Sequence, residues 1–344
     1  MNMQQFILRR LLLMIPLLIG ISLISFLISH SVPGDPVAAH LSQKAMEDPV
    51  IVATFRKQWG LDRPLWEQYW IYLKNLIRGN MGVSIRTHRP VLDDLRQFLP
   101  ASTELAVGAT LYSLILGVPF GIISAIRRDK LIDHVVRVIS LIGVSTPVFW
   151  LALISLYIFY FRLGWLPGPG RLDAGMEVDI KASITGIYMI DSLLRSDLDT
   201  FVIALRHLFL PTLVLGSGTL GIVTRMTRSS MLEVLAQDYI RTARGKGLAE
   251  RAVIVGHALK NALIPTVTVI GLSFGGIMAG TVLTETIFTW PGIGRYAYQS
   301  CITLDFPAIM GVSILIAVVF SVVNLLVDVS YAFLDPRLRV ESNY

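Results

Sequence analysis

The sequence predicts an all-α polytopic membrane protein with six transmembrane helices. Of its 344 residues, 53% are hydrophobic and only 16% are charged, whereas a soluble domain carries about a quarter charged residues. Six apolar stretches are long enough to cross a hydrocarbon core of about 30 Å, which takes roughly 20 helical residues. The net charge of +6 comes from arginine and lysine at the ends of these stretches, which is a pattern of membrane topology and not of a nucleic-acid surface.

The six predicted spans divide the chain into an N-terminal region, an external segment and a core. They cover residues 11–31, 102–126, 138–161, 208–226, 262–285 and 307–333. The corresponding regions are the N-terminus with the first span (1–32), a periplasmic segment (33–100) and a five-helix core (101–340) with loops at 162–206 and 226–260. We expect the first span to be retained and not removed as a signal peptide, because no small-x-small cleavage site precedes Val32.

Basic residues in the short loops predict that both chain termini are cytoplasmic. Seven arginines and lysines occur from Arg225 to Lys260, whereas the short loop after the fifth span holds only Arg295. Cytoplasmic loops carry such an excess, and long translocated segments largely escape the rule. Residues 33–100, rich in tryptophan and tyrosine, are expected as short helices against the external membrane surface. Residues 162–206 are expected as an irregular external loop that leads helically into the fourth span.

Glycine and proline interrupt several spans. Pro147 removes a backbone hydrogen bond and bends the third span, and the spacings Gly271-x-x-x-Gly275 and Gly276-x-x-x-Gly280 allow close helix approach in the fifth. Tight packing of a helix bundle explains these residues most simply. The alternative is that they form the moving walls of a transport pathway, as broken helices do in other transporters.

The sequence contains none of the common catalytic motifs. Gly245-Lys246-Gly247 lacks the upstream glycine and the hydroxyl of a phosphate-binding loop, and HExxH and GxSxG are absent. The single cysteine, Cys301, and six scattered histidines suggest no metal cluster. We therefore expect no enzyme activity, metal or cofactor in this chain, and any nucleotide site would belong to another subunit.

Two carboxylates, Glu104 and Asp328, are expected near the membrane interior, each within about two helical turns of a span end. A proton-coupled carrier normally places such groups near the midplane, so this pattern argues against a carrier that acts alone. Asp328 is expected to pair with cytoplasmic arginines, and a role in gating is the alternative.

Residues 231–244 are predicted to form one amphipathic helix, ended by Gly245 and Gly247, which tolerate left-handed geometry. Leu235, Tyr239 and Ala243 would enter a hydrophobic docking socket on another protein, with arginines at its rim. The alternative is an interfacial helix that binds anionic lipid head groups.

Several motifs together resemble one family of membrane proteins. Tyr239–Leu248 follows the form Y-x-R-T-A-R-x-K-G-L, and His257–Pro265 follows H-A-L-x-N-A-x-x-P. Further matches are Pro33-Gly34-Asp35-Pro36, Leu61-Asp62-x-Pro64, Met226–Glu233 and Thr284–Gly292. The set covers nearly the whole chain. It resembles ABC importer permeases of the dipeptide, oligopeptide and nickel branch, which are inner membrane components of binding-protein-dependent transport systems.

Two positions depart from the general permease pattern E-A-A-x3-G-x9-I-x-L-P. Arg241 stands at the place of the glutamate, and Pro265 lies further from Gly247 than the general spacing. Both departures agree with the form of the motif in the peptide and nickel branch, so they point to this branch within the family.

The resemblance implies the six-helix fold of methionine-importer permeases. It implies a permease subunit that moves di- or oligopeptides across the bacterial inner membrane. Its implied partners are a paralogous sister permease, two ATPase subunits that bind ATP and Mg²⁺, and a periplasmic or lipid-anchored solute-binding protein. Contact with the ATPases is implied for residues of the loop 233–248, namely Glu233, Leu235, Asp238, Tyr239, Arg241, Thr242, Ala243, Lys246, Gly247 and Leu248.

Other functions remain open at the level of sequence. Within the branch, the chain could serve a nickel-chelate or glutathione importer, and from another class, a channel or secondary transporter that acts alone. The resemblance implies that Trp290-Pro291-Gly292 is a gate or a seat for the binding protein, and an interfacial aromatic anchor is the alternative. The gate or pathway candidates are Pro147, Gly275, Gly276, Gly280, Glu285, Trp290 and Asp328.

Overall fold

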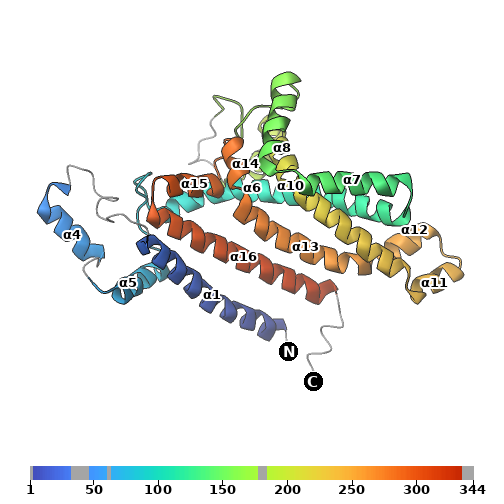
Figure 1. Ribbon diagram of the computed structural model, residues 1–344, viewed down its shortest axis with the longest axis horizontal. Coiled ribbons are helices and arrows are strands. Elements are labelled where there is room, and N and C mark those ends of the chain that lie inside the picture. Colours follow the sequence, from blue (N-terminus) through green and yellow to red (C-terminus); the bar gives the residue numbers. More distant parts are fainter. Residues whose placement is uncertain (1–2, 32–45, 60–62, 177–183, 335–344) are drawn as a thin grey trace.

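The computed structural model describes residues 3–31, 46–59, 63–176 and 184–334, most of which are helical (Figure 1). The first half of this part holds α1 (Met3–Ser31), α4 (Pro49–Trp59), α5 (Leu65–Ile77), α6 (Val91–Ile126), α7 (Leu131–Ser145), α8 (Val148–Ser155) and the π-helical η1 (Leu156–Arg162). The second half holds α9 (Tyr188–Leu194), α10 (Leu198–Leu235), α11 (Asp238–Gly245), α12 (Glu250–Ala252), the π-helical η3 (Val253–Ala258), α13 (Leu259–Gly280), α14 (Val282–Ile287), α15 (Ile293–Ile302) and α16 (Phe306–Leu334). The predicted all-α class is confirmed.

Five helices in the described part are long and apolar enough to cross a membrane. They are Ile7–Ser31, Val91–Ile126, Leu198–Leu235, Glu250–Met278 and Phe306–Ser330. A sixth candidate is a pair of helices, Leu131–Ser145 and Val148–Arg162, which are bent by 104° relative to each other. The predicted number of six spans is therefore reached when this bent pair counts as one.

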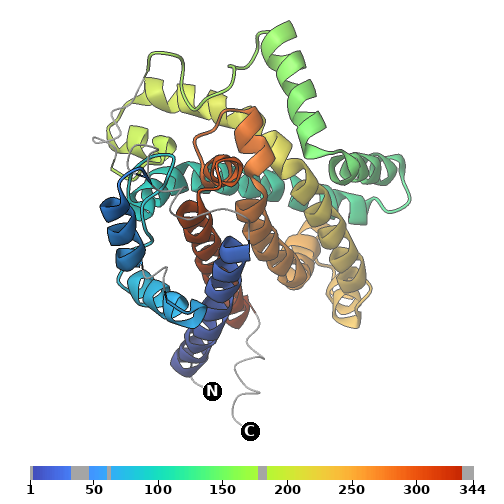
Figure 2. The same ribbon diagram turned by 60° about the vertical axis from the view of Figure 1, so that its left-hand side comes forward.

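The bend predicted at Pro147 is confirmed, and it divides the span 138–161 into two separate helices. Helix α7 ends at Ser145, Thr146 is extended with φ −79° and ψ 127°, and α8 begins directly after Pro147. The proline ring disfavours the α conformation in the preceding residue, and its missing N–H removes a helical hydrogen bond. The chain consequently changes direction at Pro147, as Figure 2 shows for the two green helices.

Helices α6 and α10 are longer than the apolar stretches that predicted them. Helix α6 begins at Val91 instead of residue 102, and α10 covers residues 198–235 instead of 208–226. Asp93 and Asp94 lie in the first turn of α6, where a carboxylate is favourable beside the unpaired N–H groups of the helix. Hydropathy detects only the apolar part of a helix, so these polar turns are missed.

Small residues allow α6 and α10 to pack closely at the centre of the molecule. A Cβ atom added to Gly121 of α6 would lie 2.8 Å from the carbonyl oxygen of Thr224 on α10. Ser113 Oγ of α6 donates a hydrogen bond to the Gly216 carbonyl oxygen of α10 at 3.0 Å. Close approach and interhelical hydrogen bonds are what hold helices together in lipid, because lipid tails are as apolar as leucine.

The bundle has two ends, which we name after their helices. The α11 end carries α11, α12 and the turn between α6 and α7, and the α15 end carries α14, α15 and the segment 78–90 (Figures 1 and 2). The start of α1 and the end of α16 approach each other toward the α11 end, where Arg10 Nη2 lies 3.1 Å from Asp328 Oδ2. The predicted pairing of Asp328 with an arginine is thus confirmed.

In the described part of the long segment before α6, α4 and α5 are short helices, as predicted. Helix α5 packs on α1, because Tyr69 Oη lies 2.9 Å from Ser22 Oγ, and its Trp66 and Trp70 side chains stay exposed. The matches at Pro33-Gly34-Asp35-Pro36 and Leu61-Asp62 lie outside the described residues. In the segment 163–197, irregular chain leads into α9 and α10, also as predicted, with residues 177–183 outside the described part.

Candidate functional site

The candidate site is the platform formed by α11 and its flanking turns, residues 233–250, at the α11 end. The prediction of one helix over residues 231–244 is wrong, because α10 continues to Leu235 and α11 is a separate helix. Gln237 is extended, with φ −71° and ψ 149°, and interrupts the helical path between them. Asp238 then lies in the first turn of α11, where a negative charge is favourable.

The inner face of α11 belongs to the hydrophobic core of this chain. Ile240 is fully buried and Ala243 is 8% exposed, and both join a cluster with Met231, Val253 and Ala258. Leu235 packs against the same cluster and is partly buried. The expectation that Ala243 enters a socket on another protein is therefore wrong for this structure, since Ala243 packs against its own chain.

The outer face of the platform is exposed and mixed in character. Tyr239 and Leu248 are 44% and 43% exposed. The other exposed candidates are Glu233, Asp238, Arg241, Thr242, Lys246 and Gly247. Two large hydrophobic side chains among polar ones are typical of a protein contact surface, whose aromatic centre is surrounded by a polar rim.

One hydrogen bond joins the platform to the bundle, and an ion pair and a glycine turn fix the shape of the platform itself. Asn261 Nδ2 of α13 donates a hydrogen bond to Tyr239 Oη at 2.8 Å, so the two halves of the sequence motif meet. Arg244 forms two hydrogen bonds with the Glu250 carboxylate, at 3.1 and 2.6 Å, and these bonds raise the pKa of the Arg244 guanidinium. Gly247 has φ +76°, the left-handed conformation that the sequence predicted for the turn.

A buried ion pair next to the platform was not predicted. Arg228 of α10 donates two hydrogen bonds to the Asp133 carboxylate of α7, from Nε at 2.8 Å and from Nη2 at 2.7 Å. The same carboxylate accepts hydrogen bonds from Ser124 Oγ and from the backbone N–H of Asp129. The only signal in the sequence is Arg228 inside the motif 226–233, which does not identify its partner.

At the α15 end, the motif 284–292 forms a turn that caps a helix. Glu285 accepts hydrogen bonds from Ser102 Oγ at 2.6 Å and from the backbone N–H of Arg295 at 2.8 Å. Ser102 Oγ in turn accepts the backbone N–H of Ile293 at 2.7 Å. The first turn of α15 thereby gains acceptors for N–H groups that a helix start leaves unpaired.

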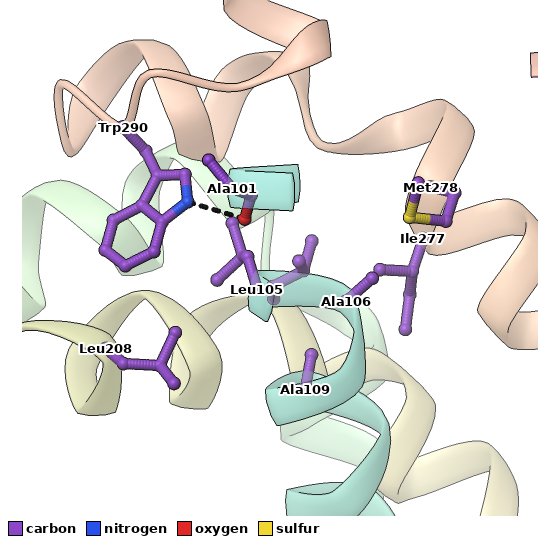
Figure 3. Close-up of a cluster of buried hydrophobic side chains, with 9 residues drawn as sticks. Ala101, Leu105, Ala106, Ala109, Leu208, Ile277, Met278 and Trp290 are labelled. Carbon is purple, nitrogen blue, oxygen red and sulfur yellow. Dashed lines mark hydrogen bonds between the residues drawn. The ribbon is translucent and has the colours of Figure 1, made fainter. Parts of the chain in front are cut away.

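Trp290 fixes this turn to α6. Its indole N–H donates to the Ala101 carbonyl oxygen at 2.8 Å, and its ring lies in a cluster with Leu105 and Leu208 (Figure 3). Trp290 is 1% exposed and Glu285 is fully buried. The alternative of an interfacial aromatic anchor at Trp290 is therefore wrong, because an anchor must reach the membrane surface. The gate role of both residues stays a prediction.

Glu104 has a packing role that connects the loop before α9 to α6. Its carboxylate accepts a hydrogen bond from Arg171 at 2.5 Å and another from the backbone N–H of Met189 at 2.9 Å. The Arg171 guanidinium lies 3.7 Å from the centroid of the Tyr188 ring. Both charged groups are almost fully buried, and each compensates the other.

The glycine candidates of α13 differ in their surroundings. A Cβ atom at Gly275 would lie 2.6 Å from the Phe320 ring of α16, so this glycine serves close packing. Gly276 has no atom within 4 Å of that position, and Gly280 is the last residue of α13. Pro147 marks the bend between α7 and α8. Whether any of them lines a pathway stays a prediction.

Comparison with known proteins identifies the family. Residues 117–340 match the model described as the binding-protein-dependent transport system inner membrane component, and residues 3–106 match the N-terminal model of the same kind of component. The chain belongs to this family. It is therefore a multi-pass inner membrane component of a binding-protein-dependent transport system, and the resemblance found in the motifs is confirmed.

Relatives in this family align along nearly the whole chain. The chain is 47% identical over 319 residues to the probable D,D-dipeptide transport system permease protein of Escherichia coli. This alignment covers 93% of each chain. It is 43% identical to the dipeptide transport system permease protein of Alkalihalophilus pseudofirmus, over 98% of this chain and 100% of that one. The methionine ABC transporter MetNI in an inward-facing form is similar in structure with a TM-score of 0.48 and 13% identity, over 68% of this chain and 93% of that chain.

Proposed function

We propose that this chain is the permease subunit of an ATP-driven importer that moves dipeptides or short oligopeptides across the inner membrane. The observation that carries this proposal is the 43% identity, over 98% of the chain, with a dipeptide transport permease. A nickel-chelate or glutathione importer is the weaker alternative, because the relatives reported above carry names of peptide transport systems.

The proposed complex contains this chain, a sister permease, two ATPase subunits and a solute-binding protein. The ATPases would bind ATP and Mg²⁺, and this chain would hold no cofactor. The family description itself names a binding protein as part of the system. The exposed outer face of the platform, with Tyr239 and Leu248 at its centre, supports an ATPase docked at the α11 end.

In the proposed coupling, the platform transmits ATPase movement to the spans. Ile240 and the Asn261–Tyr239 hydrogen bond attach α11 to α13, and the Arg228–Asp133 ion pair attaches α10 to α7. A force on α11 would therefore reach three spans through packed side chains and charge-assisted hydrogen bonds. Such contacts connect rigid elements, which a two-state change between inward- and outward-facing forms requires.

The proposed orientation places the α11 end and both termini in the cytoplasm and the α15 end outside. Its support is the excess of basic residues in the segment from Arg225 to Lys260, since short cytoplasmic loops carry such an excess. The solute-binding protein would then approach α15 and the segment 78–90.

The deciding experiment is reconstitution in liposomes. The two permeases with the two ATPase subunits are expected to accumulate a labelled dipeptide only with ATP and the binding protein, whereas this chain alone is expected to accumulate none under a proton or sodium gradient. Gradient-driven uptake by the chain alone would replace the proposal with a secondary transporter. Uptake of nickel chelates or glutathione in preference to dipeptides would assign the alternative substrate.

A further inference from the structure

A half-open cavity of about 290 Å³ lies at the α15 end, beside the turn that Glu285 caps. Its walls come from three places that are distant in the sequence: the segment before α6, the helix α6 itself, and α15 with the turn before it. The lining residues are Arg86, Phe98, Arg295, Tyr296, Gln299 and the turn Pro291-Gly292.

Two guanidinium groups line this cavity without a carboxylate partner. The Arg86 guanidinium lies 5.4 Å from the centroid of the Tyr296 ring. Arg295 Nη1 donates a hydrogen bond to the Thr289 carbonyl oxygen at 3.2 Å, which leaves its other N–H groups available. Among the described residues, neither guanidinium forms an ion pair, and none of the lining residues is acidic.

Three carboxylates near the cavity are engaged by other donors behind its wall, and one of them is Glu285, which lies against Gly292 and accepts from Ser102 and the backbone N–H of Arg295. Asp94 accepts hydrogen bonds from Tyr296 Oη at 3.1 Å and from Thr87 Oγ1 at 2.5 Å, and Arg89 Nη1 lies 3.6 Å from its second oxygen. Asp305 accepts Ser84 Oγ and the backbone N–H of residue 86. Asp94, Asp305 and Glu285 are all fully buried, and none of them lines the cavity or forms an ion pair with Arg86 or Arg295.

The positive charge of the cavity does not come from the start of α15. The first N–H groups of α15 already donate to Ser102 and Glu285, so they are unavailable to a ligand. Tyr296 stacks on Phe98 with ring centroids 5.1 Å apart, and Tyr296 is 2% exposed. Arg86 therefore lies over a packed aromatic pair and Arg295 is anchored at Thr289, and such preorganisation lowers the entropy lost on binding.

We infer that this cavity receives one carboxylate side chain of the solute-binding protein when that protein docks on the permease. The inference rests on the proposed function and names a contact for its partner. A guanidinium binds a carboxylate with paired hydrogen bonds, and two guanidinium groups fit one such anion. A free peptide fits less well, because its N-terminal ammonium would need an acidic group and the cavity walls contain none.

The test measures binding of the peptide-loaded solute-binding protein to the complete complex in nanodiscs. R86Q and R295Q are each expected to weaken binding about ten- to a hundredfold, the range for lost hydrogen bonds between charged groups. R295K is expected to restore only part of the affinity, because an ammonium cannot form the paired hydrogen bonds. The matched control is R162Q, which removes an exposed arginine of η1 outside the cavity, α15 and the segment 78–90, and this variant should bind like the unmodified complex.

A charge exchange identifies the partner group. One acidic side chain of the binding protein, changed to lysine, should weaken binding to the unmodified complex and regain affinity with R295E. Co-elution of each variant with the other subunits shows that it is assembled. Unchanged affinity in R86Q and R295Q would overturn the inference, as would an effect seen only with anionic lipids or direct competition by free dipeptide. If the unmodified complex binds no solute-binding protein at all, the proposed function itself fails.

Discussion

Neighbouring residues on α11 have opposite environments. Ala243 is buried against its own chain, whereas Thr242 and Arg244 on either side are exposed. Gly247 has the positive φ that ends the helix, and an added Cβ atom would meet no other atom within 4 Å. A substitution in this motif therefore acts through burial at one position and through backbone geometry at another.

At Gly247, we expect backbone conformation alone to decide the effect of substitution. G247V should destabilise the turn by about 1–2 kcal/mol, because a branched side chain is strained at positive φ, and it should lower ATP hydrolysis stimulated by the binding protein. G247N should be much milder, since asparagine visits this conformation. G245A is the matched control, because that position is helical and open. Equal activity of G247V and G247N would contradict the prediction.

At Ala243, we expect a loss of stability of the permease itself. A243D would bury a carboxylate without a partner in the cluster around Ile240, which costs a few kcal/mol, so the melting temperature of the purified complex should fall. The control A249D makes the same chemical change at an exposed position that precedes α12, where aspartate is a favourable cap. A stable A243D complex with defective coupling would instead support contact of Ala243 with the ATPase.

Helices in this protein are joined by polar contacts between elements that are distant in the sequence. The Asp133 carboxylate is fully buried and connects α7 with α10, while Asn261 connects α13 with α11. The break at Pro147 separates α7 from α8, so α7 is free to follow α10 without carrying α8 in the same direction. The elements near the platform therefore form one unit around α10.

The ion pair between Asp133 and Arg228 should be essential for this unit. Removing Arg228 leaves the buried Asp133 carboxylate with only the hydrogen bonds from Ser124 and Asp129, and removing Asp133 leaves a partly buried guanidinium without an anion. We therefore expect a loss at or below the about 3–5 kcal/mol typical of a broken buried pair. D133A and R228A should each lower the melting temperature. The decrease in the double variant should be smaller than the sum of the two single decreases. The control R225A removes an exposed arginine of the same helix. Additive losses would show that the two side chains do not stabilise each other.

At the scale of the whole molecule, the two ends differ in chemistry. The α11 end carries the basic platform. The α15 end carries buried carboxylates that stabilise turns, and it also carries the arginine-lined cavity. Cys301 is exposed on α15, and it is the single cysteine of the chain. It is therefore a natural probe of the proposed orientation.

We expect Cys301 to react with a membrane-impermeant maleimide in intact cells. In a C301S background, R244C should react only after the cells are permeabilised, because α11 is proposed to be cytoplasmic. D197C, in the turn before α10, should react from outside. Labelling of R244C in intact cells would reverse the proposed topology. Mass shift of the purified chain on a gel is a sufficient measurement.

The sequence by itself determined the class of the protein, the positions of its long apolar helices and the identity of the family. These properties depend on the length of apolar stretches and on motifs of adjacent residues, which are local. It also located the glycine turn at Gly247 and the bend at Pro147, because both residues restrict or permit backbone conformations directly. The extent of helices α6 and α10 was underestimated, since polar helical turns carry no hydropathy signal.

The tertiary structure alone decided which side of each motif faces the core. Arg228 forms hydrogen bonds with Asp133, which is 95 positions away in the sequence, and Trp290 donates to the Ala101 carbonyl oxygen, which is 189 positions away. Partners so far apart share no pattern in one sequence, because their meeting depends on how α6, α7 and α10 pack. The same packing also determines that Ala243 and Trp290 are buried and that Arg86 and Arg295 line one cavity.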